Sequence, residues 1–240
     1  MPSGRPRSGP NARISGPNER IGRRSAVGLI LLAAGGSVRM GRPKQLLPVS
    51  TPESGEAGAA PAESLLRHAT RVAVEAALRP AVVVLGAHSD ALVPHIADLP
   101  VHILAHSGWQ RGIGSSIKAG VECVTALAPA LDAIMIVVCD QPHLSAGVLR
   151  RLLRTYRGSA ASIVASAYAG TIGVPAIIDR SLDAELRALG DRDSARRIIN
   201  RDPSRTSAVP FPLGAVDIDT PDAYAAYLDA RRPAEPSLST

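Results

Sequence analysis

From residue 25 onward, hydrophobic and polar positions alternate between two spacings. Short aliphatic and β-branched runs, typical of buried parallel strands, are separated by longer segments with helical spacing. The runs that predict strands are 27–34, 81–86, 101–105, 133–140, 162–168, 174–179 and one within 208–219. The segments that predict helices are 64–78, 114–128, 144–156, 181–189, 194–200 and 220–232. This order predicts an α/β fold, a doubly wound and mostly parallel sheet with helices on both faces.

Several of these helices carry capping residues at their starts. Ser145 lies at the start of the 144–156 segment and is expected to cap its helix, and Thr220 is an N-cap candidate with Pro221 at the first helical position. We also expect Ser115 and Ser116 to open their helix from cap positions.

Composition bounds the class of protein. A chain of 240 residues can bury one large core, and with 45% hydrophobic but only 2% aromatic residues that core must be mainly aliphatic. Cys123 and Cys139 are the only cysteines, which predicts neither a disulfide framework nor a zinc ribbon. The apolar runs are far shorter than the roughly 18 residues that a membrane span needs, and no signal-peptide pattern is seen. We therefore expect a soluble cytoplasmic enzyme.

The net charge of +6 is concentrated at one end of the chain. Residues 1–24 contain six arginines and one glutamate, so they supply +5 of it. We interpret 1–25 as a disordered basic tail, more consistent with a solubilising leader than with a nucleic-acid-binding arm. The rest predicts a single domain over 26–232 with a low-complexity loop at about 50–63, followed by a flexible C-terminus at 233–240.

The first predicted strand runs into a loop that combines glycines with cations. Gly35 and Gly36 let backbone N–H groups face an anion, and Arg39, Arg42 and Lys44 follow within ten residues. In open parallel sheets, ligands bind beyond the carboxyl ends of the strands. The loop matches neither a P-loop nor a dinucleotide fingerprint, so it indicates either a distinct phosphate site or a tight turn with solvated cations.

Acidic residues occupy equivalent places on other strands. Asp140 ends the most hydrophobic predicted strand and could hold Mg²⁺ whose other ligands are substrate phosphates and water. The alternative is a helix N-cap, which Ser145 makes unnecessary. Asp217 and Asp219 alternate at the expected end of the last strand, where they share a face. Either could supply a second carboxylate, or they could form a capping group before Thr220.

Four segments together resemble one protein family. The stretch LLAAGGSVRMGRPKQLL resembles the LAAGxSxRMGxxK signature of nucleotidyltransferases that act on the molybdenum cofactor. GWQRGIGSSIKAG, VVCDQPHL and the segment from GVPAIID to DIDTPDAY resemble further parts of these enzymes, in the same order. The resemblance covers roughly residues 26–230, and QLLPV with CDQPHL is more similar to the cytidylyltransferase branch than to the guanylyltransferase branch.

The resemblance implies a Rossmann-like fold and a Mg²⁺-dependent reaction. CMP would pass from CTP to the phosphate of molybdenum-bound molybdopterin, releasing pyrophosphate, and an apo molybdenum hydroxylase would be a candidate downstream partner. It implies catalytic roles for Arg39, Lys44 and Asp140, and metal ligation by Asp140 and Asp219. The nucleotide-binding residues that it implies are Leu32, Ala33, Ala34, Gly35, Gly36, Arg39, Lys44, Gly86, Gly112, Ser115 and Ser116.

Some positions depart from the family pattern. His106 stands where these enzymes usually have Asn, and Val174 replaces a polar residue that faces the acceptor. The segment GDRDSAR is one residue longer than GDxGAR, so only Asp191 and Arg196 are carried over. We interpret Trp109 as packing support for its loop.

Other functions stay open from the sequence alone. They are a nucleotidyltransferase that uses GTP or ATP or a sugar-phosphate acceptor, a non-catalytic carrier of the cofactor, and an RNA-binding protein that uses the basic tail.

Overall fold

The computed structural model describes residues 26–49 and 62–231. The tail predicted at 1–25, all but the last two residues of the loop predicted at about 50–63, and the C-terminus predicted at 233–240 lie outside the described residues. Within the described part of the chain, no helix combines the length and the apolar character that crossing a bilayer requires.

Seven strands form one mixed sheet in the order β5-β4-β1-β6-β8-β7-β9. Their bounds are β1 Val27–Ala33, β4 Ala81–Leu85, β5 His102–Ala105, β6 Ala133–Val138, β7 Ile163–Tyr168, β8 Thr171–Asp179 and β9 Thr206–Pro210. The pairs β5–β4, β4–β1, β1–β6 and β7–β9 are parallel. A separate ribbon joins β2 (Pro48–Val49) to β3 (Glu63–Ser64). The predicted mostly parallel sheet is confirmed.

β8 is the antiparallel strand of this sheet and pairs with both β6 and β7. Ala169 and Gly170 connect it to β7, and both have positive φ angles, 47° and 73°, as a two-residue type I′ hairpin requires. The sequence predicts a strand that starts at residue 174. The strand starts earlier, because hairpin pairing of Tyr168 with Thr171 extends it.

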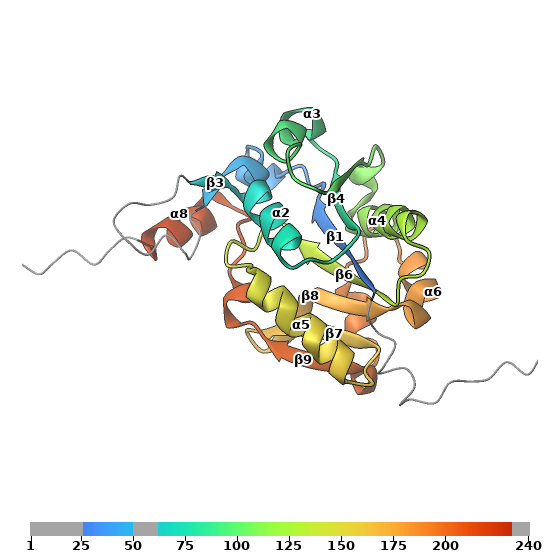
Figure 1. Ribbon diagram of the computed structural model, residues 1–240. Helices are drawn as coiled ribbons and strands as arrows, with labels where there is room; N and C mark the ends of the chain where they lie inside the picture. The colour runs from blue at the N-terminus through green and yellow to red at the C-terminus, as the bar shows by residue number, and fades with distance from the viewer. Residues whose placement is uncertain (1–25, 50–61, 232–240) are drawn as a thin grey trace, which may run out of the picture.

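Helices cover both faces of the sheet (Figure 1). Their bounds are α2 Leu65–Glu75, α3 Ser89–Leu92, α4 Ile113–Leu127, α5 Ala146–Gly158, α6 Asp183–Arg187, α7 Arg196–Ile199 and α8 Pro221–Asp229. Side chains of a strand alternate between faces, so Leu29 and Leu31 of β1 pack with α2 and α5, whereas Ile30 and Leu32 pack with α4, α6 and α7. Both faces of β1 are therefore buried, as its apolar sequence predicts.

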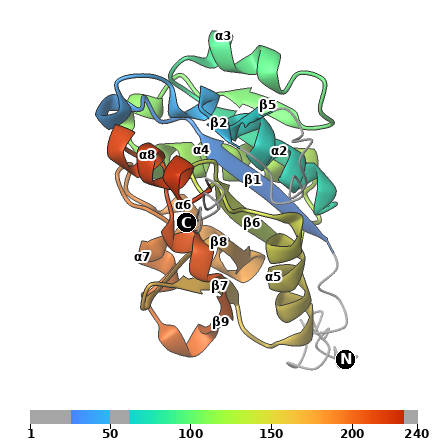
Figure 2. The same ribbon diagram turned by 90° about the vertical axis from the view of Figure 1, so that its left-hand side faces the viewer.

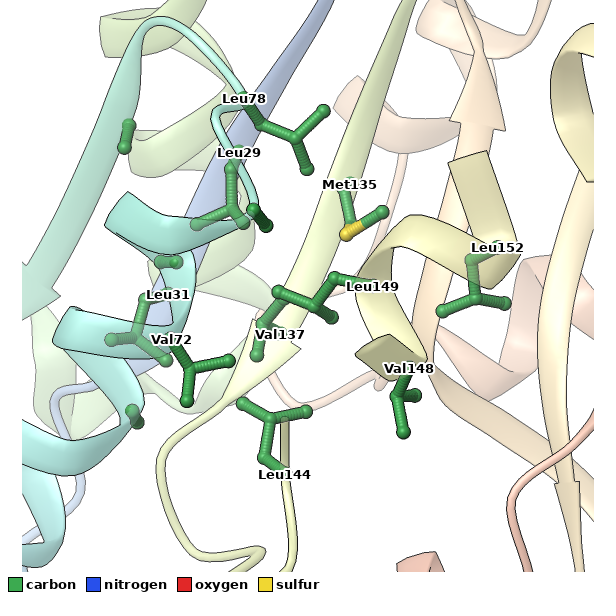
Figure 3. Close-up of a cluster of buried hydrophobic side chains, with 14 of the residues drawn as sticks. Leu29, Leu31, Val72, Leu78, Met135, Val137, Leu144, Val148, Leu149 and Leu152 are labelled. Carbon is green, nitrogen blue, oxygen red and sulfur yellow. The ribbon is translucent and has the colours of Figure 1, made fainter. Parts of the chain in front are cut away.

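The face under α2 and α5 holds the larger part of the aliphatic core. Figure 3 shows Leu29 of β1 and Met135 of β6 beside Val72 of α2 and Leu149 of α5. Each of these four side chains is at most 2% exposed. Truncating a buried leucine in such a core costs about 2–5 kcal/mol. This packing fixes β1 and β6 relative to each other, and their carboxyl ends carry the candidate site.

Helix α8 closes the carboxyl side of the sheet. It lies next to the segment that follows β1 (Figure 2), and Tyr224 and Tyr227 pack there with Met40, Leu47 and Val49. Thr220 caps the helix by accepting a hydrogen bond from the Ala223 amide at 3.2 Å. Ser145 caps α5 in the same way, through the Val148 amide. Both predicted caps are confirmed.

The prediction that Ser115 and Ser116 cap α4 is wrong. The N-cap residue is Gly112, and the helix begins at Ile113, so both serines lie inside its first turn. Gly112 has a φ of 132°, a conformation that serine rarely adopts. A Cβ at this position would also lie 2.5 Å from the Asp191 carbonyl oxygen. Glycine therefore opens the helix.

The prediction that Asp217 and Asp219 lie at the end of the last strand is also wrong. β9 ends at Pro210, and a 3₁₀ helix, Pro212–Ala215, follows it. Proline at positions 210 and 212 lacks the amide that a strand ladder needs. Asp217 and Asp219 therefore lie beyond the sheet, in an extended segment that leads to α8.

Candidate functional site

The candidate site lies where the strand order reverses. After β1 the chain adds β4 and β5 on one side of it, and then returns to add β6 on the other side. Ligands of doubly wound sheets bind at the carboxyl ends of the strands at this switch point. The glycine loop follows β1 there, and Asp140 follows β6. The Ile218 amide donates a hydrogen bond to the Asp140 carbonyl oxygen at 2.9 Å, which brings Asp219 to the same place.

Gln45 holds the glycine loop from inside. Its side chain is fully buried, and its Nε2 donates to the carbonyl oxygens of Ala33 at 3.0 Å and Gly35 at 2.8 Å. Its Oε1 accepts a hydrogen bond from the Ser37 hydroxyl, whose oxygen accepts one from the Lys44 amide. Gln45 begins the QLLPV segment, but the sequence did not indicate this role for it. The available signal was a polar residue directly before the apolar pair LL in PKQLL.

Lys44 connects the loop to the carboxylates. Its Nζ lies 2.9 Å from Asp140 Oδ2 and 2.5 Å from Asp219 Oδ1. The Lys44 side chain is only 13% exposed, so this ion pair is largely shielded from solvent. Arg39 extends the network, because its guanidinium lies 2.7 Å from Asp219 Oδ2, although its side chain is 71% exposed. The three residues with predicted catalytic roles, Arg39, Lys44 and Asp140, are therefore brought together.

The charges of this cluster are reflected in its pKa values. Burial alone would lower the pKa of Lys44, but the Asp140 carboxylate and the hydrogen bond to Asp219 raise it well above its usual value. Burial raises and Lys44 lowers the pKa of Asp219, which falls below 3.8 overall. Burial, together with the charges of Asp219 and Asp140, raises the pKa of Asp217. Asp219 is thus held as a carboxylate and Lys44 as an ammonium over the physiological range.

A cavity of about 360 Å³ opens beside this cluster. The predicted nucleotide-site residues that line it are Leu32, Ala33, Ala34, Gly35, Lys44, Gly112 and Ser116, and the predicted metal ligand Asp140 lines it too. Trp109, Gln110 and Ile113 complete the wall on the α4 side. The cavity has a charged region at Lys44 and Asp140 and an uncharged aromatic region at Trp109.

Other predicted nucleotide-site residues lie outside the cavity lining. Trp109 covers Gly36 and Gly86, since a Cβ at either glycine would meet the indole within 3.2 Å. Ser115 is buried, and its hydroxyl donates to the Gly112 carbonyl oxygen at 2.7 Å and lies 3.1 Å from His106 Nε2. These contacts agree with the interpretation of Trp109 as packing support, and they give Ser115 a structural place in its loop.

A second cavity of about 440 Å³ adjoins the first and shares Leu32, Ile113, Val138 and Asp140 with it. Its wall is mostly aliphatic and includes Val174. Its polar side chains include Gln141, Arg196 and Asp217.

The residues carried over from GDRDSAR have separate surroundings. Arg196 lines the second cavity, and its Nη2 lies 3.5 Å from the Tyr168 hydroxyl. Asp191 lines neither cavity. Its carboxylate accepts a hydrogen bond from Lys118 at 2.7 Å, and this ion pair, with desolvation opposing it, lowers the pKa of Asp191.

The carboxylates at the site suit a shared divalent cation. Among residues 26–49 and 62–231, no three His, Cys, Asp or Glu side chains converge to hold a metal by themselves. However, Asp140 and Asp219 each direct one carboxylate oxygen at the Lys44 ammonium. The space between the two carboxylates therefore already holds one positive charge. Two carboxylates with further ligands from phosphates and water are a typical Mg²⁺ arrangement. The donor set therefore fits a metal that is held jointly with a substrate.

Comparisons with known proteins identify the family. Residues 29–206 match the family model described as the MobA-like NTP transferase domain. A curated relative, nicotine blue oxidoreductase of Paenarthrobacter nicotinovorans, is 30% identical over 178 residues, which cover 72% of this chain and 80% of the relative.

Solved structures share the fold of this chain. Rv0371c from Mycobacterium tuberculosis H37Rv is 26% identical with a TM-score of 0.68, covering 86% of this chain and 99% of that one. A manganese complex of the same protein is 23% identical with a TM-score of 0.64, covering 86% and 100%. A nucleotidyl transferase from Methanothermobacter thermautotroptrophicus (Mth528) is 20% identical with a TM-score of 0.67, covering 86% and 99%, and shows the fold alone.

Proposed function

The chain belongs to the MobA-like NTP transferase domain family, and we propose that it transfers CMP from CTP to the phosphate of molybdenum-bound molybdopterin, with release of pyrophosphate. The observation that carries the proposal is the contact of Lys44 with Asp140 and Asp219 beside the glycine-loop cavity. One cation and two carboxylates are the charges that a triphosphate and its metal would require, and this supports the proposal.

The reaction breaks one bond and forms one. An oxygen of the acceptor phosphate attacks the α-phosphorus of CTP, and the bond from that phosphorus to the bridging oxygen breaks, so the electron pair leaves with pyrophosphate. Because no covalent enzyme intermediate is needed, the protein has to position the two phosphates and neutralise their charge. Lys44 and Arg39 supply the positive charge at the leaving group.

The remaining residues of the site bind and orient. Asp140 and Asp219 would hold Mg²⁺, which when bound withdraws charge from the phosphate oxygens. The loop from Ala33 to Gly35, fixed by Gln45, would bind the nucleotide through backbone groups. The second cavity shares Asp140 with the glycine-loop cavity, so an acceptor bound there would lie beside the nucleotide.

The experiment that tests this proposal measures pyrophosphate release. Purified protein, Mg²⁺ and molybdenum-bound molybdopterin are incubated with CTP, GTP or ATP in separate reactions. We expect release with CTP. Release with GTP or ATP alone would keep the transfer reaction and overturn the choice of base, and release only after addition of a sugar phosphate would overturn the acceptor. If no combination of nucleotide and acceptor releases pyrophosphate, the non-catalytic carrier becomes the better-supported function.

The RNA-binding alternative predicts a different result. It requires the basic residues 1–24, whereas the proposed reaction uses groups between Leu32 and Asp219. Deleting residues 1–24 should leave turnover unchanged within about twofold. If the protein without residues 1–24 loses turnover but keeps its melting temperature, these residues are needed for function, and the RNA-binding alternative is favoured.

A second candidate function is an oxidoreductase. Two observations favour it: the 30% identical relative is named nicotine blue oxidoreductase, and the cavity on the acceptor side is mostly aliphatic, which suits a flat organic substrate. An oxidoreductase would use the glycine-loop cavity for a reduced nucleotide cofactor. Oxidation of NADH in the presence of an aromatic dye, with no pyrophosphate release from CTP, would support this candidate against the transferase.

A further inference from the structure

Trp109 occupies a flat slot between two glycines. A Cβ on Gly86 would lie 2.6 Å from Cβ and 2.7 Å from Cγ of Trp109, and a Cβ on Gly36 would lie 3.1 Å from Cη2 and 3.2 Å from Cζ3. The indole therefore extends from the end of β4 to the loop after β1. Neither glycine has a positive φ angle, so close contacts rather than backbone conformation favour glycine at both positions. At Gly86 these contacts also include the Ala34 carbonyl oxygen, which would lie 2.6 Å from a Cβ.

The loop that carries Trp109 is held in place at both ends. The His106 ring and the Ser115 hydroxyl are 3.1 Å apart, and the hydroxyl also contacts the carbonyl oxygens of Gly108 and Gly112. The Gly112 amide in turn donates to the Trp109 carbonyl oxygen at 3.1 Å. An indole on such an anchored loop is a fixed wall.

The position of the Trp109 indole in the cavity indicates which part of a nucleotide it would contact. Lys44 and Asp140 line the cavity and carry its charges, so the triphosphate lies against them. The two glycines beside the indole, Gly36 and Gly86, are uncharged. Gln110, which follows Trp109 and also lines the cavity, offers an amide with both donor and acceptor groups. An aromatic face beside an amide suits a nucleobase.

We propose that Trp109 determines base specificity: its indole fills the Gly36–Gly86 slot, forms the wall on which the base packs, and leaves room for a single-ring pyrimidine but not for a purine. This inference rests on the proposed use of a nucleoside triphosphate. It gives Trp109 a role in binding in addition to packing support for its own loop. Removing the indole should weaken pyrimidine binding and admit the larger base.

The test uses Trp109 itself, because it is the only tryptophan of the chain. Titration of the full-length protein with CTP and Mg²⁺ should change the intrinsic fluorescence in a saturable way, whereas GTP should do so only at much higher concentration. Equilibrium dialysis with radiolabelled nucleotides then compares variants. Trp109→Ala should raise the Kd for CTP about tenfold, the loss expected for one base–aromatic contact, and lower the Kd for GTP.

Two further variants separate specificity from folding. Trp109→Phe keeps an aromatic wall and should retain most of the preference for CTP. In Gly36→Ala, the new methyl group meets the outer ring of the indole at about 3.1 Å, so the indole must shift slightly to make room. CTP binding should weaken while the melting temperature changes little.

Two results would overturn the inference in distinguishable ways. If wild-type protein binds CTP but folded Trp109→Ala keeps the same ratio of CTP to GTP affinity, Trp109 only supports its loop, and the proposed function stands. If wild-type protein binds no nucleoside triphosphate, the proposed function fails and the inference fails with it.

Discussion

Lys44 and Asp140 are 96 positions apart in the chain, yet the Lys44 ammonium lies 2.9 Å from the Asp140 carboxylate. Lys44 follows β1 and Asp140 follows β6, two strands that pair in parallel. The sheet therefore delivers a cation and an acid to the same edge. Asp219 joins them from the segment before α8, so three distant parts of the chain form one charged cluster.

Replacing Lys44 by methionine should lower kcat by about 10²–10³-fold, the usual cost of removing one preorganised charge from a transition state. The methionine keeps most of the side-chain volume, so the fold should survive. Lys118→Met is the matched control, because Lys118 also pairs with an aspartate but lines neither cavity. Equal turnover of the two variants would show that Lys44 has no special role.

Asp140→Asn should nearly abolish turnover, because an amide oxygen is a weaker ligand for a divalent cation than a carboxylate. The defect should lessen as the Mg²⁺ concentration is raised, which a purely structural role would not produce. Asp98→Asn, which disturbs an exposed pair with Arg67, serves as the control. Near-normal turnover of Asp140→Asn would contradict the metal assignment.

Gln45→Leu should damage the glycine loop. The change leaves the Ala33 and Gly35 carbonyl oxygens without their donor, and an unpaired buried polar group costs about 1–3 kcal/mol. We expect the free energy of unfolding to fall by that amount in urea denaturation, and the KM for the nucleotide to rise more than kcat falls. A variant with unchanged KM would show that Gln45 is needed for packing alone.

Glu63 should make stability depend on pH. Burial raises its pKa, but the hydrogen bonds and charges of Arg71 and His68 outweigh burial and hold the pKa below its ordinary value of 4.5. A carboxyl whose pKa is lower in the folded than in the unfolded state stabilises the fold fully above the unfolded pKa. This contribution is lost as the pH falls below about 4.5 and through the lower, folded pKa.

Glu63→Gln removes the titrating group, so the comparison with wild type isolates it. Melting temperatures measured from pH 7 to pH 3 should show wild type losing its advantage over Glu63→Gln at the acidic end. If the difference between the two proteins stays constant over that range, the ion pair of Glu63 with Arg71 does not contribute through its charge.

The strands and the longer helices could be predicted from the sequence, because they depend on the local spacing of hydrophobic residues. The edge of the sheet that carries the candidate site could also be predicted, because ligands bind beyond the carboxyl ends of parallel strands. The start of α4 could not be predicted, because it depends on the Asp191 carbonyl oxygen, which approaches Gly112 from a segment about 80 residues away. The position of the segment that carries Asp217 and Asp219 could not be predicted either. It depends on Pro210 and Pro212 ending β9 and on the Ile218 amide reaching Asp140.

Within the site, the sequence indicated some of the residues that lie together but not the contacts that hold them there. The charges of Arg39, Lys44 and Asp140 indicated a phosphate site, and the structure places them together. The sequence did not indicate that Gln45 lies beneath the loop, or that Trp109 spans Gly36 and Gly86. The contacts of Gln45 depend on how the loop folds back over it, and those of Trp109 join segments that are far apart in the chain.

The central claim is nucleotidyl transfer, and the fate of the α-phosphorus tests it most directly. CTP labelled at the α-phosphorus is incubated with the protein, Mg²⁺ and molybdenum-bound molybdopterin, and the products are separated. We predict that the label moves into the cofactor and that label placed at the γ-phosphorus leaves with pyrophosphate. Recovery of the α-label only in CTP or free CMP, with an unmodified cofactor, would contradict the claim.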